Sequence, residues 1–248
     1  MWGRIGFMAM AGLMAAMPVT AEEVGFIDRF KTIGPEWHVA EYNFDHDKFD
    51  TDWRRAHVKL GVFDDTDGLT LRLGPHEGGL NRFAGGSIRR EDTSHYGTYE
   101  VQMRAASHPG VVTGFFTYTG PYYGTRHDEI DIEFLGKNTR QIHLAWFVDG
   151  ALQNRFIDLG FDAATETATY AFEWRPNSLR WFVNGAEIYR HTDADGPIPQ
   201  MPSRLFVNLW AADPSISIWA GVIDPKTRTQ AQVSYVRFTP WQPEISGF

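Results

Sequence analysis

Hydrophobic and polar residues alternate with a period of two along many short stretches of this chain. In TYEVQMRA (98–105), Tyr99, Val101 and Met103 alternate with polar side chains. Such alternation predicts a β-strand with one buried face and one solvent-facing face. Further stretches with strand-like patterns are LTLRLG (69–74), VVTGFFTYTG (111–120), EIDIEFLG (129–136), RQIHLAWFVDG (140–150), ATYAFEWRP (168–176), SLRWFVNG (178–185), RLFVNLWA (204–211) and AQVSYVRF (231–238).

Turn-forming residues separate these stretches. Gly, Pro, Asp and Asn recur between them, and the connections at Pro176-Asn177 and Asn184-Gly185 are typical of β-hairpins. Apart from the N-terminus, only Ala163 to Ala168 has a helix-like pattern. Many short strands with regular turns predict an all-β sandwich or barrel. No linker or internal repeat divides the chain after residue 21, so we expect one domain, residues 22–248.

The first 21 residues have a different pattern. Arg4 gives a positive start, Ile5 to Met17 is apolar, and PVTA ends in small residues before Glu22. An apolar run of about 13 residues is too short to span a bilayer but fits a secretory signal peptide. We predict a signal peptide over 1–21, with cleavage after Ala21, and a secreted or periplasmic mature protein. The alternative is a cytosolic protein with an apolar N-terminus.

Composition and charge exclude several classes of function. The net charge of −8 makes nucleic acid a poor partner, because affinity for phosphate depends on cationic side chains. The absence of cysteine excludes disulfides, zinc–thiolate sites and thiol nucleophiles. Phosphate-binding glycine patterns, HExxH and a complete EF-hand loop are absent, and the nine histidines show no metal-ligand spacing. We expect a monomer without a nucleic-acid partner, a membrane span or a metal in its active site.

The sequence HDEIDIEFLG (127–136) places three acids on one face of a predicted strand. Glu129, Asp131 and Glu133 alternate with Ile130 and Ile132. Glu and Asp are poor strand formers, and like charges along one face repel. The pattern therefore needs a reason other than strand stability.

The spacing of Glu129 and Glu133 fits acid–base catalysis on a sugar. Four residues at a rise of ~3.3 Å put their Cα atoms about 13 Å apart, and side chains that lean inward bring the carboxyls to about 5–6 Å. That is the range for retaining glycoside hydrolysis, in which one carboxylate attacks the sugar and the other acts as acid and then as base. Asp131, between them, can hydrogen-bond the nucleophile and raise the pKa of the acid by like-charge repulsion. The alternative is a solvated strand face with three incidental acids.

The strand DEIDIEFLG resembles the active-site strand of glycoside hydrolase family 16, especially that of bacterial lichenases, which are endo-β-1,3-1,4-glucanases. Other segments with counterparts in the same order are WHVA (37–40), YGTYEVQM (96–103), FFTYTGP (115–121), LGFDAA (159–164), TYAFEWRPNSLRWFVNG (169–185) and NLW (208–210). The resemblance implies a β-jelly-roll sandwich of two antiparallel sheets, with a sugar-binding cleft across the concave sheet. It also implies that Glu129 is the nucleophile, Asp131 assists it and Glu133 is the acid/base. The strand has no inserted residue before Glu133, a form similar to that of lichenases and plant xyloglucan enzymes.

The resemblance also implies a set of substrate-binding residues. Sugar rings have apolar faces and hydroxyl rims, so a cleft for them needs aromatic platforms and a few polar groups. The positions implied are Arg89, Phe116, Tyr118, His127, His143, Asn208, Trp210 and Trp219. For the other large aromatic residues, such as Trp174, Trp181 and Phe182, we expect core packing.

Several positions depart from the lichenase pattern. An acid, an asparagine and a tyrosine of the family are replaced here by Ser87, Ala145 and Phe147, while a glutamine is replaced by His143. His127 stands where lichenases have an aromatic residue and xyloglucan enzymes a histidine. These changes remove hydrogen-bonding groups from the implied subsites, so the reaction type is better specified than the glycan.

No cofactor is expected to be required. A structural calcium is common on the outer side of this sandwich in the family, but the aspartate expected to bind it corresponds to Ser234 here.

The leading hypothesis is a secreted retaining endo-β-glucanase that cleaves a β-1,3-1,4-type glucan, with a polysaccharide as its partner. A bacterial exopolysaccharide depolymerase or a xyloglucan-type transglycosylase would use the same three acids. A glycan-binding jelly roll without catalysis is the third alternative, although it has no need of a spaced carboxyl pair.

Overall fold

The computed structural model of the protein describes residues 23–243. The predicted signal peptide, residues 1–21, lies outside the described residues, as do residues 244–248. The two described ends lie close together in the fold, because β1 (Phe26–Asp28) pairs with the last strand, β16 (Thr229–Pro240).

The described chain is almost entirely β-structure. The other strands are β2 (Trp37–Val39), β3 (Thr51–Trp53), β4 (Val58–Phe63), β5 (Thr66–Pro75), β6 (Phe83–Arg90), β7 (Gly97–Arg104), β8 (Val111–Thr119), β9 (Asp128–Leu135), β10 (Gln141–Val148), β11 (Ala151–Asp158), β12 (Ala168–Arg175), β13 (Ser178–Val183), β14 (Ala186–Thr192) and β15 (Arg204–Ala211). Short helices occur at η1 (Arg55–His57), η2 (Pro121–Tyr123), η3 (Pro214–Ile216) and α1 (Ser217–Ala220).

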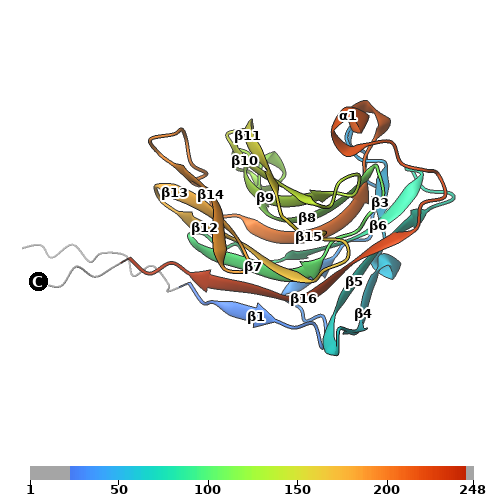
Figure 1. Ribbon diagram of the computed structural model, residues 1–248, viewed down its shortest axis with the longest axis horizontal. Coiled ribbons are helices and arrows are strands. Elements are labelled where there is room, and N and C mark those ends of the chain that lie inside the picture. The colour runs from blue at the N-terminus through green and yellow to red at the C-terminus, as the bar shows by residue number, and fades with distance from the viewer. Residues whose placement is uncertain (1–22, 244–248) are drawn as a thin grey trace, which may run out of the picture.

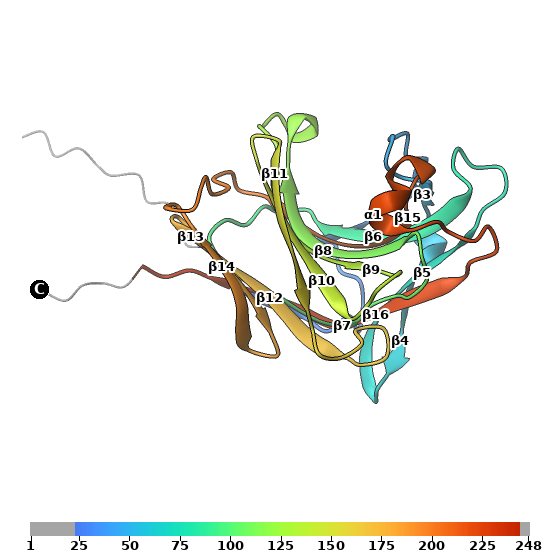
Figure 2. The ribbon, with the colours of Figure 1, turned by 45° about the horizontal axis from the view of Figure 1, so that its top comes forward.

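The strands form two layers that share β6. One layer, here called the β9 sheet, has the order β11-β10-β9-β8-β15-β6; the other, the β7 sheet, has the order β5-β16-β7-β12-β13-β14. The first part of β6 pairs with β5 and its second part with β15, so β6 joins the two layers. Within residues 23–243, every strand pairing is antiparallel except that of β3 with β6. Both layers are strongly curved, as Figures 1 and 2 show. The predicted all-β jelly-roll sandwich is confirmed.

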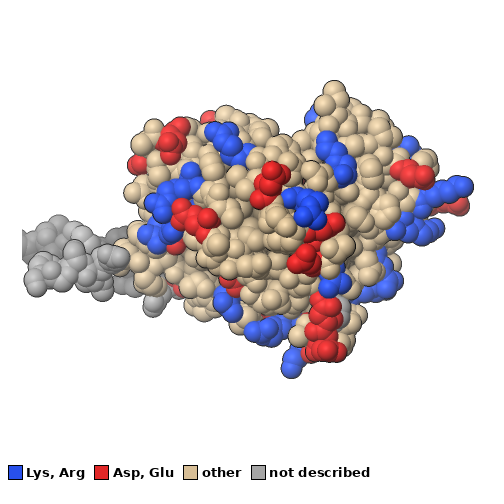
Figure 3. Space-filling model, viewed as in Figure 1, with Lys and Arg blue, Asp and Glu red and all other residues tan. Residues whose placement is uncertain are grey.

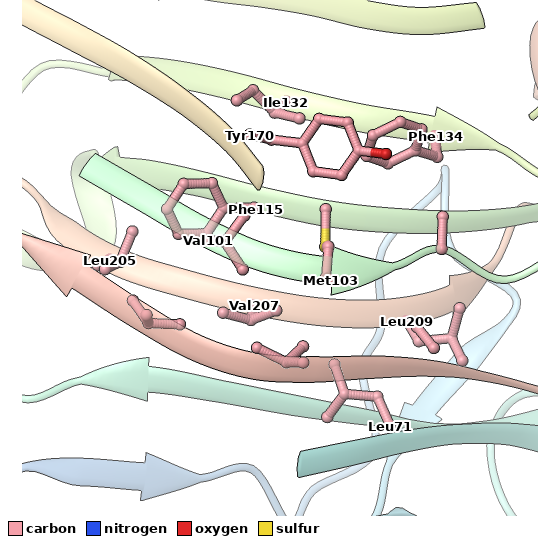
Figure 4. Close-up of a cluster of buried hydrophobic side chains, with 14 of the residues drawn as sticks. Leu71, Val101, Met103, Phe115, Ile132, Phe134, Tyr170, Leu205, Val207 and Leu209 are labelled. Carbon is pink, nitrogen blue, oxygen red and sulfur yellow. The ribbon is translucent and has the colours of Figure 1, made fainter. Parts of the chain in front are cut away.

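The core lies between the two layers and follows the predicted alternation. Val101 and Met103 of β7 face Phe115, Ile132 and the other apolar residues of the β9 sheet across the interior (Figure 4). Each of these four side chains is fully buried. Burial of a large apolar side chain contributes about 1.5–3 kcal/mol to folding stability. Apolar burial in this core is therefore the main interaction that holds the β9 sheet in place.

The expectation of core packing is confirmed for Trp174 and Trp181, which are fully buried, but it is wrong for Phe182. Phe182 follows Trp181 in the same strand, and successive side chains of a strand point to opposite faces. Its ring lies on the solvent side of the β7 sheet, where the guanidinium of Arg180 covers it at 5.0 Å.

Strand β6 was not among the stretches predicted to be strands, because Gly85 and Gly86 interrupt its pattern. The structure shows why glycine is needed there. A Cβ on Gly85 would overlap the carbonyl oxygen of Leu209 in β15, and a Cβ on Gly86 would lie 2.7 Å from the carbonyl oxygen of His57. The two glycines therefore allow other backbone segments to approach β6 where it passes from one layer to the other.

Both predicted hairpins are confirmed. The turn between β13 and β14 has positive φ at Asn184 (48°) and Gly185 (79°), as a tight two-residue hairpin requires. The helix-like segment from Ala163 to Ala168 is a turn that leads into β12, and α1 was not predicted.

Charged residues of both signs are interspersed over the face seen in Figure 3. Among residues 23–243, no helix is long and apolar enough to cross a membrane.

Candidate active site

The three acids of β9 lie on the outer face of the β9 sheet, as the alternation predicted. Ile130 and Ile132 are fully buried in the core, whereas Glu129 and Glu133 keep about 17% of their side-chain surface exposed. The apolar residues anchor the strand from below, so the carboxyls are held on the opposite side. In Figures 1 and 2, β10 and β11 rise on one side of this face and α1 on the other.

The strand register brings the other predicted residues to the same face, because directly paired residues of neighbouring strands point the same way. Tyr118 and Phe147 flank Glu129, and Phe116 and Ala145 flank Asp131. Gly114 and His143 flank Glu133 in the same way. Continuing across β15 and β6, the same face carries Asn208, Trp210, Ser87 and Arg89. Every predicted substrate-binding residue on a strand of this sheet therefore lies on one surface.

Asp131 is the most buried of the three acids, with 4% of its surface exposed. Burial raises its pKa well above the ordinary value, and the nearby charges of Glu129 and Glu133 raise it further. The raised pKa favours the protonated carboxyl, which can donate a hydrogen bond to Glu129, its hydrogen-bond partner. Its Oδ2 has no partner within the described residues.

A histidine contacts each of the two glutamates. Nε2 of His127 lies 2.5 Å from Oε2 of Glu129, and Nδ1 of His143 lies 2.9 Å from Oε2 of Glu133. The resemblance implied substrate contacts for these two histidines, which stay predictions; the structure adds that their ring nitrogens bond the acids.

The end of the face near α1 contains two tryptophans. Trp210 is only 5% exposed, and its ring stacks on Phe49 at 4.1 Å. Trp219, in α1, lies 6.0 Å from Trp210 and 5.6 Å from His143, and it is only partly buried. Trp219 is thus the more accessible ring at this end.

Arg89 and Tyr123 form the opposite border of the face. Nη1 of Arg89 donates to the hydroxyl of Tyr123 at 3.1 Å, and Arg204 lies over the Tyr123 ring at 4.3 Å. Arg89 also pairs with Glu91 at 3.2 Å.

Three aromatic residues of this face were not predicted. Phe206 stacks on Phe116 at 5.0 Å with an interplanar angle of 9°, Phe156 stacks on His143, and Tyr123 bonds Arg89. Phe206 could have been found, because it precedes Asn208 and Trp210 in the alternation of RLFVNLWA. The others depend on strand pairing and loop conformation.

The start of β9 is fixed by Asp128, which is fully buried. Its carboxylate accepts hydrogen bonds from the backbone N–H groups of Asp149, Gln200 and Met201, and it pairs with Arg126. Asp128 thereby ties the acidic strand to the β10–β11 turn and to the segment before β15.

Within residues 23–243, no group of three or more His, Asp or Glu side chains is arranged to hold a metal ion. Ser234 is buried at a bulge of β16 and supplies no carboxylate, so this position does not fit the calcium ligand of the family.

A cavity of about 580 Å³ lies elsewhere, between β2 and β4, and Trp37 and Val58 are among its lining residues. None of its lining residues belongs to β8, β9 or β10.

Comparison with known proteins identifies the family of this chain and supports its jelly-roll fold. Residues 45–237 match the model of glycosyl hydrolases family 16. The chain belongs to this family. It is 36% identical to the beta-glucanase of Bacillus amyloliquefaciens over 235 residues, which cover 94% of each chain.

Two solved structures are also close. A prokaryotic beta-1,3-1,4-glucanase (lichenase) derived from a mouse hindgut metagenome superposes with a TM-score of 0.81 at 34% identity, covering 88% of this chain and 99% of the other. The Bacillus licheniformis beta-glucanase superposes with a TM-score of 0.80 at 34% identity, covering 89% and 100%. Membership of the family makes this protein a glycoside hydrolase.

The raised pKa of Asp131 generates a prediction about stability. Between the ordinary aspartate pKa near 4 and the raised value, the folded protein keeps a proton that the unfolded chain releases, so stability falls as the pH rises through that interval. Asp131→Asn removes this effect. At pH 7 the variant should be more stable than the unmodified protein, while its activity falls. The gain should shrink as the pH is lowered toward 4. Thermal unfolding followed by circular dichroism at several pH values measures this.

Asp52→Asn is a control of opposite sign. Burial alone would raise the pKa of Asp52, but hydrogen bonds from Asn81 and from the backbone of Phe44 and Leu80 lower it. The Asp52→Asn variant should lose stability at pH 7, and its deficit should shrink below about pH 4. An Asp131→Asn variant that is destabilised at pH 7, as the control is, would contradict the raised pKa of Asp131.

Proposed function

We propose that this protein is an exported, retaining endo-β-glucanase that cleaves internal bonds of a β-1,3-1,4-type glucan. The observation that carries the proposal is the outer face of β9, where the buried Asp131, whose pKa is raised, lies between two partly exposed glutamates. The beta-glucanase relatives support the substrate class. The N-terminal sequence supports export to the periplasm or the medium.

In the first step, the carboxylate of Glu129 attacks the anomeric carbon of the sugar and the bond to the leaving oxygen breaks. Glu133 gives its proton to that oxygen, so the departing chain leaves as a neutral alcohol. Asp131 donates a hydrogen bond to Glu129 and so fixes the orientation of the attacking carboxylate. The product of this step is a covalent glycosyl ester on Glu129.

In the second step, Glu133, now a carboxylate, takes a proton from a water molecule, and the water oxygen attacks the anomeric carbon. The ester bond breaks, Glu129 is released as a carboxylate, and Glu133 is protonated again. Two inversions at one carbon give net retention of the β-configuration.

The aromatic rings on the outer face suit a β-glucan chain. Phe116 and Phe206 form one stacked pair, while Tyr118 lies beside Glu129 and Trp219 beside His143. Such rings pack against the apolar faces of successive glucose units.

A second candidate reaction is transfer of the glycosyl group to another sugar instead of water. It is favoured by the apolar side of the face at β10 and β11, where Phe147 pairs with Leu152 and His143 pairs with Phe156. Leu152 and Phe156 are about half exposed, at 52% and 47%. These side chains can pack against an acceptor sugar and reduce the access of water.

The mechanism predicts different behaviour for the two glutamate variants. Glu129→Ala and Glu133→Ala should each lower kcat on glucan by several orders of magnitude with little change in thermal stability, because both side chains are partly exposed. With an aryl β-glycoside that needs no acid, azide should restore turnover of the Glu133→Ala variant and give a β-glycosyl azide, identified by NMR. An α-glycosyl azide from that variant would exclude Glu129 as a nucleophile in a retaining mechanism.

The departures from the lichenase pattern predict weak activity on lichenan. Ala145 lies between Asp131 and Asn154, and Phe147 lies beside Glu129. The combined variant Ala145→Asn, Phe147→Tyr adds two polar groups, each contributing about 0.5–1.5 kcal/mol. It should raise kcat/KM on lichenan roughly 5- to 150-fold. Reducing-end assays on lichenan, laminarin and xyloglucan compare it with the unmodified enzyme. No gain on lichenan, together with a higher activity of the unmodified enzyme on another glucan, would rule out the mixed-linkage assignment.

A further inference from the structure

Each of the two glutamates is bonded by its own histidine, and the two histidines come from different places in the fold. His127 immediately precedes β9 and bonds Glu129 through Nε2 at 2.5 Å. His143 lies on β10, directly opposite Glu133, and bonds it through Nδ1 at 2.9 Å. The two contacts therefore involve opposite nitrogens of the imidazole ring.

Aromatic neighbours hold each imidazole in a fixed plane. The ring of His127 stacks on Phe147 at 4.6 Å with an interplanar angle of 19°, and Tyr118 meets it edge-on at 5.3 Å. Stacked and edge-on contacts each restrict ring rotation, so Nε2 is kept directed at Glu129.

His143 is held in the same way beside Glu133, on the same face of the β9 sheet. Its ring stacks on Phe156 at 4.3 Å with an angle of 24°, and Trp219 meets it at 68° and 5.6 Å. Only 6% of the His143 side chain is exposed. A buried ring with one face covered and Nδ1 engaged with a carboxylate has little surface left for a sugar.

From this geometry we infer that His127 and His143 are positioning residues, one for each catalytic carboxylate. The inference rests on the proposed function, because it assigns each histidine to the role proposed for its glutamate. His127 orients the nucleophile Glu129, and His143 orients the acid/base Glu133. Phe147 and Phe156 act through these histidines, because Phe147 stacks on the ring of His127 and Phe156 on that of His143.

The hydrogen-bond chemistry gives each histidine a distinct effect. An ionised carboxylate is only an acceptor, so His127 must carry its proton on Nε2 to bond Glu129. Together with the donor from Asp131, this N–H fixes the plane of the attacking carboxylate.

His143 carries its proton on Nδ1 and donates to Oε2 of Glu133. The other oxygen of Glu133 is then left to exchange a proton with the glycosidic oxygen and later with water. A hydrogen bond to a charged acceptor is roughly twice as strong as one to a neutral acceptor. The bond from His143 therefore strengthens as Glu133 gives up its proton.

Alanine variants test the inference with two substrates. On glucan, His127→Ala and His143→Ala should each lower kcat about 10- to 100-fold, with KM within about threefold of the unmodified value. A dinitrophenyl β-glycoside has a leaving group that needs no proton. With this substrate, the rate of the phenolate burst for His143→Ala should stay close to that of the unmodified enzyme. It should fall for His127→Ala, because the nucleophile acts on both substrates.

Amide variants test the position of the donor. The amide nitrogen of glutamine occupies roughly the place of Nε2, and that of asparagine the place of Nδ1. His127→Gln and His143→Asn should therefore recover most of the lost kcat, whereas His127→Asn and His143→Gln should recover less. His57→Ala is the matched control, since Nδ1 of His57 lies near the carbonyl oxygen of Arg72 and contacts neither glutamate. It should leave both assays unchanged.

Three results would overturn the inference. A rise in KM with kcat unchanged would make the histidines substrate contacts. An equal loss on both substrates for both alanine variants, in step with a lower melting temperature and no recovery by amides, would make them structural. Unchanged kinetics would remove any role. Glu129→Ala and Glu133→Ala are measured in parallel: if they are inactive while the histidine variants behave normally, only this inference fails, and if they stay active, the proposed function fails.

Discussion

The side chains of β9 alternate between the apolar core and the outer face of the sheet, and the rest of this structure depends on that constraint. Ile130, Ile132 and Phe134 are fully buried in the core, so Glu129, Asp131 and Glu133 are forced onto the opposite face. A slip of one residue would place three acids in the core, at a cost that no sandwich of this size could offset. The register of β9 with β8 and β10 is therefore strongly specified, and with it the identity of every residue beside the acids.

The arrangement of the three acids destabilises the fold locally, and neighbouring interactions offset this cost. Asp131 is buried beside two carboxyls, and its raised pKa records the cost of removing its charge from water. Apolar packing beneath the strand and the anchoring of Asp128 to three backbone N–H groups supply the compensation. Packing and hydrogen bonds around β9 thus allow the fold to keep an energetically costly group of carboxyls at the centre of the strand. Local cost of this kind is common at functional sites.

Most of the fold could be predicted from sequence because its signals are local. The alternation in β7 and β9 and the Asn184-Gly185 hairpin need only neighbouring residues to be recognised. The errors have equally physical reasons. Strand β6 was missed because Gly85 and Gly86 break the pattern, although close contact with other backbone is what requires them. Phe182 was assigned to the core from its residue type alone, against the period of its own strand.

The placement of the three acids on one face of β9 could be predicted, but the side chains that contact them could not. Arg89, Phe116, Tyr118 and Asn208, which the resemblance implied, lie on the same face as the three acids. It also implied that His127 and His143 contact the sugar, which stays a prediction, but it did not imply the bonds from their ring nitrogens to Glu129 and Glu133. These bonds depend on cross-strand pairing and on stacking with Phe147 and Phe156, and neither can be read from spacing along the chain. The same limit explains why Phe156 and Tyr123 were missed.

The central claim is that Glu129 forms a covalent bond to the sugar during turnover. A 2-deoxy-2-fluoro β-glucoside or β-oligoglucoside with a dinitrophenyl leaving group slows both steps but slows the second more, so the intermediate accumulates. Peptide mass spectrometry of the inactivated enzyme should then find one added glycosyl group on the peptide that contains residues 127–136, with fragmentation placing it on Glu129. A label on Glu133, or full turnover without any covalent adduct, would contradict the account.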